Sequence, residues 1–303
     1  MKKPTTRGIS AVAKKSTKSS KTNFEAIQRL NTGDLYFPYL VGLIEGDGWF
    51  SVTKNGNFVK YEFGIELHSR DIQLIEKLQE FLGVGSVHIS TKSRNRVMYR
   101  VRKKSDLISV ILPIFYKYPM FSNKQYDYLR FRETLLNDIK NSKDLIQYTR
   151  PVEPLNTMEA MLEKPYFKYW LIGFIEAEGC FSIYQPAADN SLVASFEISQ
   201  TNAPILIEAI RTNLSFRPKG YEDKKTNHFK LKVTSLIDLE TIINFLHNNP
   251  VKLIGHKKTQ YEEWLTRLSS ISRYKSLKIP AEYSKTNKIS ITSPKFYLLN
   301  TKY

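Results

Sequence analysis

Residues 39–50 read YLVGLIEGDGWF, and residues 170–181 read WLIGFIEAEGCF. The two stretches share an ordered pattern: an aromatic residue, an apolar run interrupted by glycine, a glutamate, a small residue, a second acid, another glycine and, two positions later, phenylalanine. An internal match of this kind indicates a duplicated unit, and the two copies are too far apart for a solenoid repeat. The sequence therefore predicts two copies of one α+β unit.

The period of the apolar residues predicts the same order of elements in each copy: a helix, two strands, a helix, two strands, then further helices. The predicted strands lie at 49–55, 58–67, 180–186 and 192–199 and within 86–102 and 217–233. Apart from the two motif helices, the predicted helices lie at 70–83, 106–118, 203–214 and 236–248.

Five segments follow from this duplication. They are a basic N-terminal extension (1–34), a first repeat (35–140), a polar linker (141–164), a second repeat (165–272) and a C-terminal tail (273–303). The first 24 residues contain seven Lys or Arg and no acid. Such a segment fits a targeting leader, a nucleic-acid arm or a disordered extension.

The charge balance indicates a polyanionic partner. The chain has 46 Lys and Arg against 29 Asp and Glu, a formal net charge of +17. Because each neutralised phosphate releases condensed counterions, nucleic acid is favoured over an anionic membrane, although a basic ribosomal protein would share this composition. No apolar run approaches the roughly 18 residues of a membrane helix. The single cysteine, Cys180, excludes a disulfide framework and a thiolate zinc site.

Small residues recur one helical turn apart in both motifs, at Gly42 and Gly46 and again at Gly173 and Ala177. Side chains of this size let two helix backbones approach closely. The alternative is ordinary helix packing inside each core. If the two motif helices pack against each other, their C-terminal ends come together.

Each motif helix is predicted to end in an acid followed by glycine, Asp47–Gly48 and Glu178–Gly179. Glycine at such a position is expected to adopt the left-handed conformation. A carboxylate there is unfavourable because the helix dipole presents its negative end, and two neighbouring carboxylates would repel each other. A divalent cation such as Mg²⁺ would relieve both effects, so both acids are candidate metal ligands for phosphodiester chemistry. The alternative, a solvated turn, does not explain the same pair at matching positions.

Two lysines occupy matching positions further along. The segments 121–131 and 254–264 align without gaps and place Lys124 opposite Lys257. A cation beside the paired acids would stabilise charge that develops on a phosphate, or would position the attacking water. Both lysines are therefore candidate catalytic residues.

One face of the predicted strands is apolar, and the other is polar or aromatic. A two-stranded ribbon fits the major groove of DNA, where Arg and Lys reach guanine edges. The alternative for any single residue is a solvated sheet face. The candidate DNA-binding residues are Trp49, Ser51, Thr53, Lys60, His88, Lys92, Arg94, Arg100, Arg102, Ser182, Tyr184, Lys230 and Lys232.

LVGLIEGDG and LIGFIEAEG resemble the motif that names the LAGLIDADG homing endonuclease family, and the resemblance covers about residues 35–272. The flanking stretches are similar to proteins of fungal mitochondrial group I introns, particularly the endonuclease/maturases of cytochrome b introns. The resemblance implies two pseudo-symmetric αββαββα repeats whose antiparallel β-saddles bind double-stranded DNA. It further implies a mitochondrial monomer that cuts across the minor groove, leaves 3′ overhangs and uses Mg²⁺ or Mn²⁺.

The family's site residues map onto this chain position by position. The last acids of the motifs correspond to Asp47 and Glu178, and the preceding Gly46 and Ala177 also belong to the implied metal site. The downstream basic residues correspond to Lys124 and Lys257 and the polar residue that ends the second strand to Gln200. The first repeat has Leu67 in place of that glutamine, so the two half-sites are expected to be unequal.

The sequence favours a site-specific double-strand DNA endonuclease, and the resemblance leaves open a second function as a cofactor of group I intron splicing. One alternative is a maturase that binds intron RNA without cutting DNA, and another is a DNA-binding regulator of the same fold. The paired acids and lysines favour cleavage, because a protein that only binds has no use for carboxylates beside a negative helix end.

Overall fold

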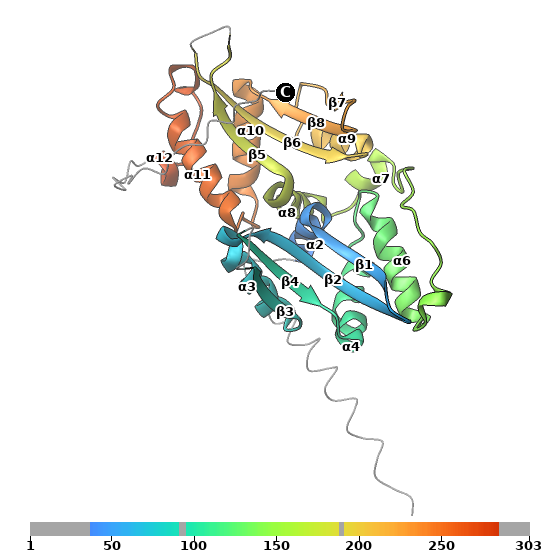
Figure 1. Cartoon of the computed structure of the whole chain (residues 1–303). Helices are drawn as coiled ribbons and strands as arrows, with labels where there is room; N and C mark the ends of the chain where they lie inside the picture. Colours follow the sequence, from blue (N-terminus) through green and yellow to red (C-terminus); the bar gives the residue numbers. More distant parts are fainter. Residues whose placement is uncertain (1–36, 91–94, 188–190, 285–303) are drawn as a thin grey trace, which may run out of the picture.

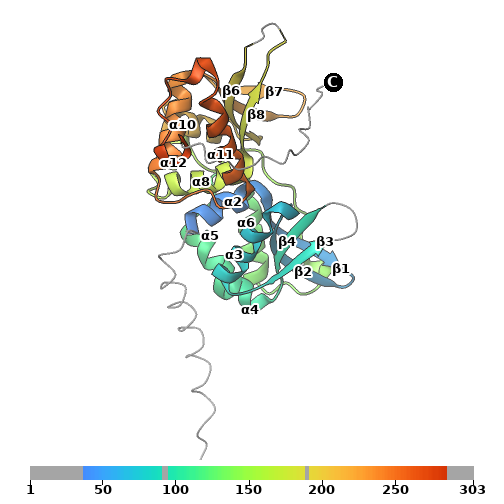
Figure 2. The same cartoon turned by 90° about the vertical axis from the view of Figure 1, so that its left-hand side faces the viewer.

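The computed structural model describes residues 37–90, 95–187 and 191–284. Helices α2 (Phe37–Asp47) and α8 (Phe167–Glu178) lie side by side at the centre, and each half of the molecule adds one four-stranded sheet with its own helices (Figures 1 and 2). This arrangement confirms the predicted duplication of an α+β unit.

The first half follows the predicted order of elements. It contains β1 (Gly48–Asn55), β2 (Phe58–His68), η1 (Ser69–Asp71), α3 (Ile72–Leu82), β3 (Ser86–Ser90), β4 (Arg96–Val101), the consecutive helical segments α4 (Lys104–Asp106), η2 (Leu107–Ile111) and α5 (Leu112–Lys117), then α6 (Lys124–Leu136) and η3 (Ser142–Asp144). The segment η2 is a turn of π-helix.

The second half repeats this order. It contains α7 (Met158–Leu162), α8, β5 (Gly179–Tyr184), β6 (Val193–Thr201), α9 (Pro204–Asn213), β7 (Tyr221–Asp223), β8 (His228–Val233), α10 (Leu236–Asn248), α11 (His256–Leu268), η4 (Ser272–Tyr274) and α12 (Ala281–Ser284).

The two sheets have the same topology and the same register. Their strand orders are β1-β2-β4-β3 and β5-β6-β8-β7, and all neighbouring strands are antiparallel. The glycine that begins the first strand pairs with an isoleucine in both sheets: Gly48 with Ile65 and Gly179 with Ile198. The duplication therefore extends to individual residues, and Leu67 occupies the position of Gln200.

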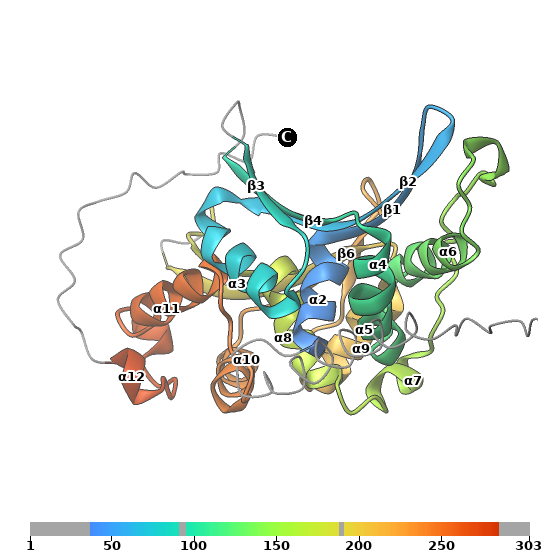
Figure 3. The same ribbon diagram turned by 90° about the horizontal axis from the view of Figure 1, so that it is seen from below.

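Each sheet packs one face on its helices. Phe50, Phe63 and Val101 lie in the core with less than a tenth of their surface exposed, and their strand neighbours point to the opposite face. Figure 3 shows the first sheet curving over α2 and α3, with its concave face turned away from these helices. The concave face is the predicted DNA-binding surface.

The two motif helices touch through their backbones. A Cβ atom on Gly42 would lie 2.0 Å from the carbonyl oxygen of Trp170, and a Cβ atom on Gly173 would lie 1.9 Å from that of Tyr39. A Cβ atom on Gly46 would lie 2.3 Å from the Cβ of Ala177. The predicted close pair of helices is confirmed, and it runs between the halves.

The expected left-handed glycines at the helix ends are wrong. Gly179 is extended, with φ −71° and ψ 146°, and Gly48 is not among the glycines of positive φ. Each strand begins at once and folds back on the last turn of its helix, so a Cβ on Gly48 would lie 2.7 Å from Ile44 Cγ2 and one on Gly179 would lie 2.7 Å from the Ile175 carbonyl oxygen. Glycine is required here for space, not for its conformational freedom.

The segment predicted as a linker is held against the first half before it crosses to the second. The Tyr148 hydroxyl donates to Asp127 at 2.8 Å, and the Asn123 amide donates to the Pro151 carbonyl at 3.0 Å. Helix α7 then packs against α9. Within the described ranges, no helix is long and apolar enough to cross a membrane.

Gly42→Ala and Gly173→Ala should each destabilise the fold, because the added methyl group would overlap a backbone carbonyl that cannot rotate away. We expect a loss of about 3 kcal/mol or more in the free energy of unfolding, measured by urea titration. Gly220→Ala is the matched control, because its Cβ would lie 3.2 Å from a side-chain methyl group. A loss below about 1 kcal/mol at Gly42 would contradict the backbone contact.

Candidate active site

The two predicted catalytic acids meet where the motif helices end. Asp47 is the last residue of α2, and Glu178 is the last residue of α8. A Cβ atom on Gly46 would lie 3.2 Å from Glu178 Cγ, so the side chain of Glu178 lies against the last turn of the opposite helix. The structure thus brings one carboxylate from each half to a shared site.

The surroundings of these carboxyl groups favour their neutral forms. Burial, together with the negative charge of Asp47, raises the pKa of Glu178 to about 7 against the opposing effect of Lys124. Asp47 reaches solvent, yet the protein packed around it raises the pKa of its carboxyl to about 6 against the effects of Lys124 and Lys257. Two ionised carboxylates at the negative ends of two helices are unfavourable in the protein alone.

Both predicted lysines bind the helix ends. The ammonium group of Lys124 donates to the carbonyl oxygens of Ile44, Gly46 and Gly48 at 3.1, 3.0 and 2.7 Å. Lys257 donates to the Gly179 carbonyl at 2.5 Å. These hydrogen bonds satisfy carbonyl groups that a helix leaves without partners at its C-terminus. Each lysine therefore holds a positive charge at the helix end of its own half, and both lysines lower the pKa values of both acids.

Burial also lowers the pKa of Lys124 to about 8, and the nearby Glu45 opposes this shift. The ammonium form of this lysine is therefore retained at neutral pH but lost in mildly alkaline solution. A pKa close to the working pH suits a group that moves a proton during catalysis.

The two half-sites differ in the groups around each acid. In the second half, the Gln200 amide donates to Glu178 at 3.3 Å. In the first half, Leu67 is buried at the equivalent position, and Arg96 lowers the pKa of Asp47 from a neighbouring strand. The expected difference between the half-sites is therefore present in the side chains.

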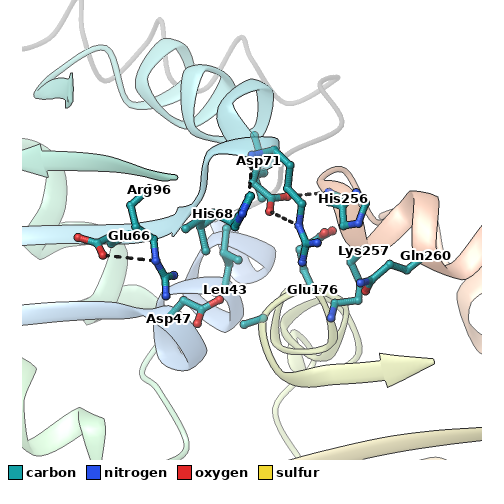
Figure 4. A pocket seen from close by; sticks show the side chains of 14 residues that line it. Leu43, Asp47, Glu66, His68, Asp71, Arg96, Glu176, His256, Lys257 and Gln260 are labelled. Carbon is teal, nitrogen blue, oxygen red and sulfur yellow. Dashed lines mark hydrogen bonds and ion pairs between the residues drawn. The ribbon is translucent and has the colours of Figure 1, made fainter. Parts of the chain in front are cut away.

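A polar pocket of about 190 Å³ opens beside Asp47 and is shared by both halves (Figure 4). The first half contributes Asp47, Glu66 and Arg96, and Arg96 lies 3.9 Å from Glu66. The second half contributes His256 and Lys257 from the start of α11. The site thus combines acids with basic side chains that are able to contact phosphate oxygens.

The first acid of each motif, Glu45 or Glu176, is part of the repeated sequence pattern, but the pattern alone predicts no role for it. Glu45 is fully buried and Glu176 is 7% exposed. Burial raises the pKa of both, that of Glu176 to about 7. A glutamate repeated within an otherwise apolar helix was the signal that could have identified them, because a buried carboxylate requires hydrogen-bond donors.

By strand alternation and burial, the candidate DNA-binding residues that the structure describes lie on the faces of the two sheets turned away from the helices. They are Trp49, Ser51, Thr53, Lys60, His88, Arg100, Ser182, Tyr184, Lys230 and Lys232, with Arg102 directly after β4. The predicted Lys92 and Arg94 lie outside the described residues.

Several of these residues already have partners on the surface. Lys60 lies 3.1 Å from Glu62, which also pairs with Arg102. Lys232 lies 4.3 Å from the centre of the Tyr184 ring. The Nε atom of Arg100 is enclosed and has no hydrogen-bond partner among the described residues.

The helix ends provide oxygen atoms for a hard cation. Their donors are the carboxylates of Asp47 and Glu178 and the carbonyl groups of Gly46 and Ala177, of which Gly46 already accepts from Lys124. In the part of the chain that the structure describes, no group of three or more His, Cys, Asp or Glu forms a complete protein cage. This donor set fits Mg²⁺, which prefers few carboxylates and takes its other ligands from water and phosphate.

Comparison with known proteins identifies the class to which this fold and site belong. The model of the LAGLIDADG endonuclease family matches residues 40–135 and 171–268, which include both motifs and both lysines, so the chain belongs to this family. A solved structure of I-SmaMI bound to an uncleaved DNA target in the presence of calcium ions has a TM-score of 0.65 and 25% identity. The match covers 80% of this chain and 92% of that chain, and it confirms the predicted LAGLIDADG homing endonuclease fold.

The relatives found by sequence include intron-encoded proteins of yeasts. The uncharacterized mitochondrial protein RF1 of Saccharomyces cerevisiae is 30% identical over 59% of this chain and 38% of that protein. The probable intron-encoded endonuclease Cox1-I1b of Schizosaccharomyces pombe is 28% identical over 79% of this chain and 65% of that protein. The chain therefore spans less than two thirds of the length of these two curated relatives.

The raised pKa values predict an unusual pH dependence of stability. Because Asp47 and Glu178 bind protons more tightly when folded, these two groups hold more protons in the folded chain between about pH 4 and 7, and their contribution to the free energy of unfolding falls as pH rises through that range. We expect Glu178→Gln to be more stable than wild type at pH 8 by about 1–2 kcal/mol, after allowance for solvent screening, and equal to it at pH 4.

Urea titration from pH 4 to 8 in the absence of divalent ions measures this difference. Glu80→Gln, which removes an exposed acid on α3, is the matched control and should follow wild type. Identical pH profiles for wild type and Glu178→Gln would contradict the assigned electrostatics.

Proposed function

We propose that this protein is a site-specific, metal-dependent DNA endonuclease that binds a long double-stranded target and cuts both strands. The observation that carries this proposal is the meeting of Asp47 and Glu178, one from each half, at the adjacent ends of α2 and α8. The similarity to I-SmaMI, which has the same fold and was solved bound to an uncleaved DNA target, supports the proposal. Two acids related by duplication suit a substrate with two antiparallel strands.

DNA binding is assigned to the concave faces of the two sheets. The strands place basic side chains such as Arg100 and Lys230 along one surface, and the net charge of +17 attracts the phosphate backbone. Sheets in a groove reach base edges with alternate side chains, which gives site specificity. Two saddles in one chain allow a monomer to cover the whole target.

The chain's own groups then act at the two scissile phosphates. Lys124 and Lys257, held by the helix-end carbonyls, stabilise the negative charge that develops on the phosphate. Gln200 holds the orientation of the Glu178 carboxylate through its hydrogen bond. The pocket beside Asp47 presents Arg96 to the phosphate backbone.

Asp47 and Glu178, with the carbonyl groups of Gly46 and Ala177, would hold Mg²⁺ or Mn²⁺. A bound divalent ion neutralises the two carboxylates, polarises the phosphate and lowers the pKa of a bound water. The protein's contribution is to keep the two acids together against their repulsion.

A mitochondrial location and a second role in group I intron splicing belong to the same proposal, because the relatives include mitochondrial and intron-encoded proteins. The alternative is a maturase that binds its intron RNA and does not cut DNA. The retention of both acids and both lysines favours cleavage.

Asp47→Asn and Glu178→Gln should each abolish double-strand cutting, with a loss of at least about 100-fold in rate, because each removes the charge that holds the metal and aligns the reaction on one strand. The assay is cleavage of a plasmid that carries the intronless insertion site, with Mg²⁺ present. Glu80→Gln should cut like wild type. Tight binding by the wild-type chain without cutting, with any divalent ion tried, would support the maturase instead.

Arg100→Ala and Lys230→Ala should each weaken DNA binding by about 3- to 10-fold and reduce the dependence of the logarithm of affinity on the logarithm of salt concentration by about 1. Titration of a labelled target between 50 and 200 mM salt, roughly the range where phosphate contacts dominate, gives both quantities. Lys77→Ala, on the solvent side of α3, is the control for net charge. Equal salt slopes in all four proteins would remove the assignment of the binding face.

A further inference from the structure

Two buried glutamates connect the motif helices with the segments that carry the catalytic lysines. Glu45 Oε1 accepts hydrogen bonds from the backbone N–H of Phe121, at 2.8 Å, and from that of Ser122. These residues lie three and two positions before Lys124, the first residue of α6. The carboxylate therefore fixes the turn from which this lysine reaches the end of α2.

The second half repeats the arrangement. Glu176 accepts hydrogen bonds from the backbone N–H of Ile254 at 2.7 Å and from that of Gly255 at 3.1 Å. These residues lie directly before α11, whose second residue is Lys257. The same element of each motif thus positions the lysine of its own half.

Each of these glutamates also accepts a hydrogen bond from the opposite half. Trp170 Nε1 donates to Glu45 Oε2 at 2.7 Å, and the Tyr39 hydroxyl donates to Glu176 Oε2 at 3.0 Å. Tyr39 and Trp170 are the aromatic residues that open the two matched motifs, and both are completely buried. The exchange is reciprocal, as symmetry-related contacts across an interface are.

From these contacts we infer that Tyr39 and Trp170 are positioning residues that act across the boundary between the halves, each setting the place of the lysine in the opposite half. The chain of contacts runs from Trp170 through Glu45 to the turn before Lys124. It runs equally from Tyr39 through Glu176 to the turn before Lys257. Tyr39 lies in α2 but acts on the lysine of the second half, and Trp170 lies in α8 but acts on the lysine of the first half. Correct pairing of the two helices is therefore required to complete both lysine sites.

The two connections are not equally strong. Asp71 Oδ1 also accepts a hydrogen bond, from the backbone N–H of His256 at 2.6 Å, so a second carboxylate holds the start of α11. A Cβ atom on Gly255 would lie 2.6 Å from Asp71 Oδ1 and 2.9 Å from Glu176 Oε1, which shows how tightly this turn is enclosed. Loss of the Tyr39 hydroxyl should therefore slow cutting of its DNA strand less than loss of the Trp170 indole N–H slows cutting of the other strand.

This inference rests on the proposed function and is tested by the rate of nicking of each DNA strand separately. A target labelled on one strand or the other is cut with Mg²⁺, and Lys124→Ala and Lys257→Ala first establish which strand each lysine serves. We expect Trp170→Phe to slow the strand that Lys124→Ala slows, by about tenfold, and Tyr39→Phe to slow the other strand by about threefold. Tyr99→Phe is the matched control, because it removes another buried tyrosine hydroxyl, which donates to the Val84 carbonyl at 2.7 Å, and should leave both rates unchanged.

Equal slowing of both strands, no slowing, or slowing of the strand served by the same half would overturn the inference. Backbone amide hydrogen exchange gives a readout that does not depend on cutting. Tyr39→Phe should accelerate exchange at Ile254 and Gly255 and leave Phe121 and Ser122 unchanged, and Trp170→Phe should do the reverse. If wild type fails to cut, the proposed function fails, whereas unchanged exchange in both variants refutes the positioning role alone.

Discussion

The contact between the backbones of α2 and α8 is the constraint on which the rest of the structure depends. At Gly42 and Gly173 there is no room for a methyl group, so the distance between the two helices is set by main-chain atoms and not by adjustable side chains. This distance places two carboxylates at adjacent helix ends, where the charge of Asp47 makes ionisation of Glu178 less favourable. Packing that stabilises the core therefore creates a site whose charges are unfavourable in the protein alone.

The remainder of each motif compensates for this electrostatic conflict. Lys124 and Lys257 satisfy the carbonyl groups at the helix ends and bring positive charge to the acids. In the case of Lys124 the ammonium group is buried, and its pKa is lowered as a result. Polar groups held in an unfavourable state by a rigid scaffold are typical of functional sites, because a ligand of the opposite charge then binds to a preorganised set of partners.

Much of the fold and the identity of the acids could be predicted from the sequence, because they depend on local periodicity and on a repeated motif. Phe50 and Ser51 alternate as a half-buried strand requires, and Asp47 and Glu178 recur at matching positions. The conformation of Gly48 and Gly179 could not be predicted, since a strand that begins at once overrides the usual preference at a helix end. The hydrogen bond between Glu45 and Trp170 could not be predicted either, because the two residues are 125 positions apart in the sequence and only the packing of the helices brings them together.

Duplication within one chain has allowed the two halves to diverge where a symmetric dimer could not. Gln200 contacts Glu178, while the equivalent Leu67 is apolar. Asp71, four residues after Leu67, accepts a hydrogen bond from the start of α11. The equivalent residue of the second half, four residues after Gln200, is Pro204, which has no carboxylate. A dimer of identical subunits presents the same residues twice and so suits a palindromic site. A chain whose halves share a backbone but differ in side chains at the site and on the sheets is suited, under the proposed function, to a duplex whose two half-sites differ in sequence.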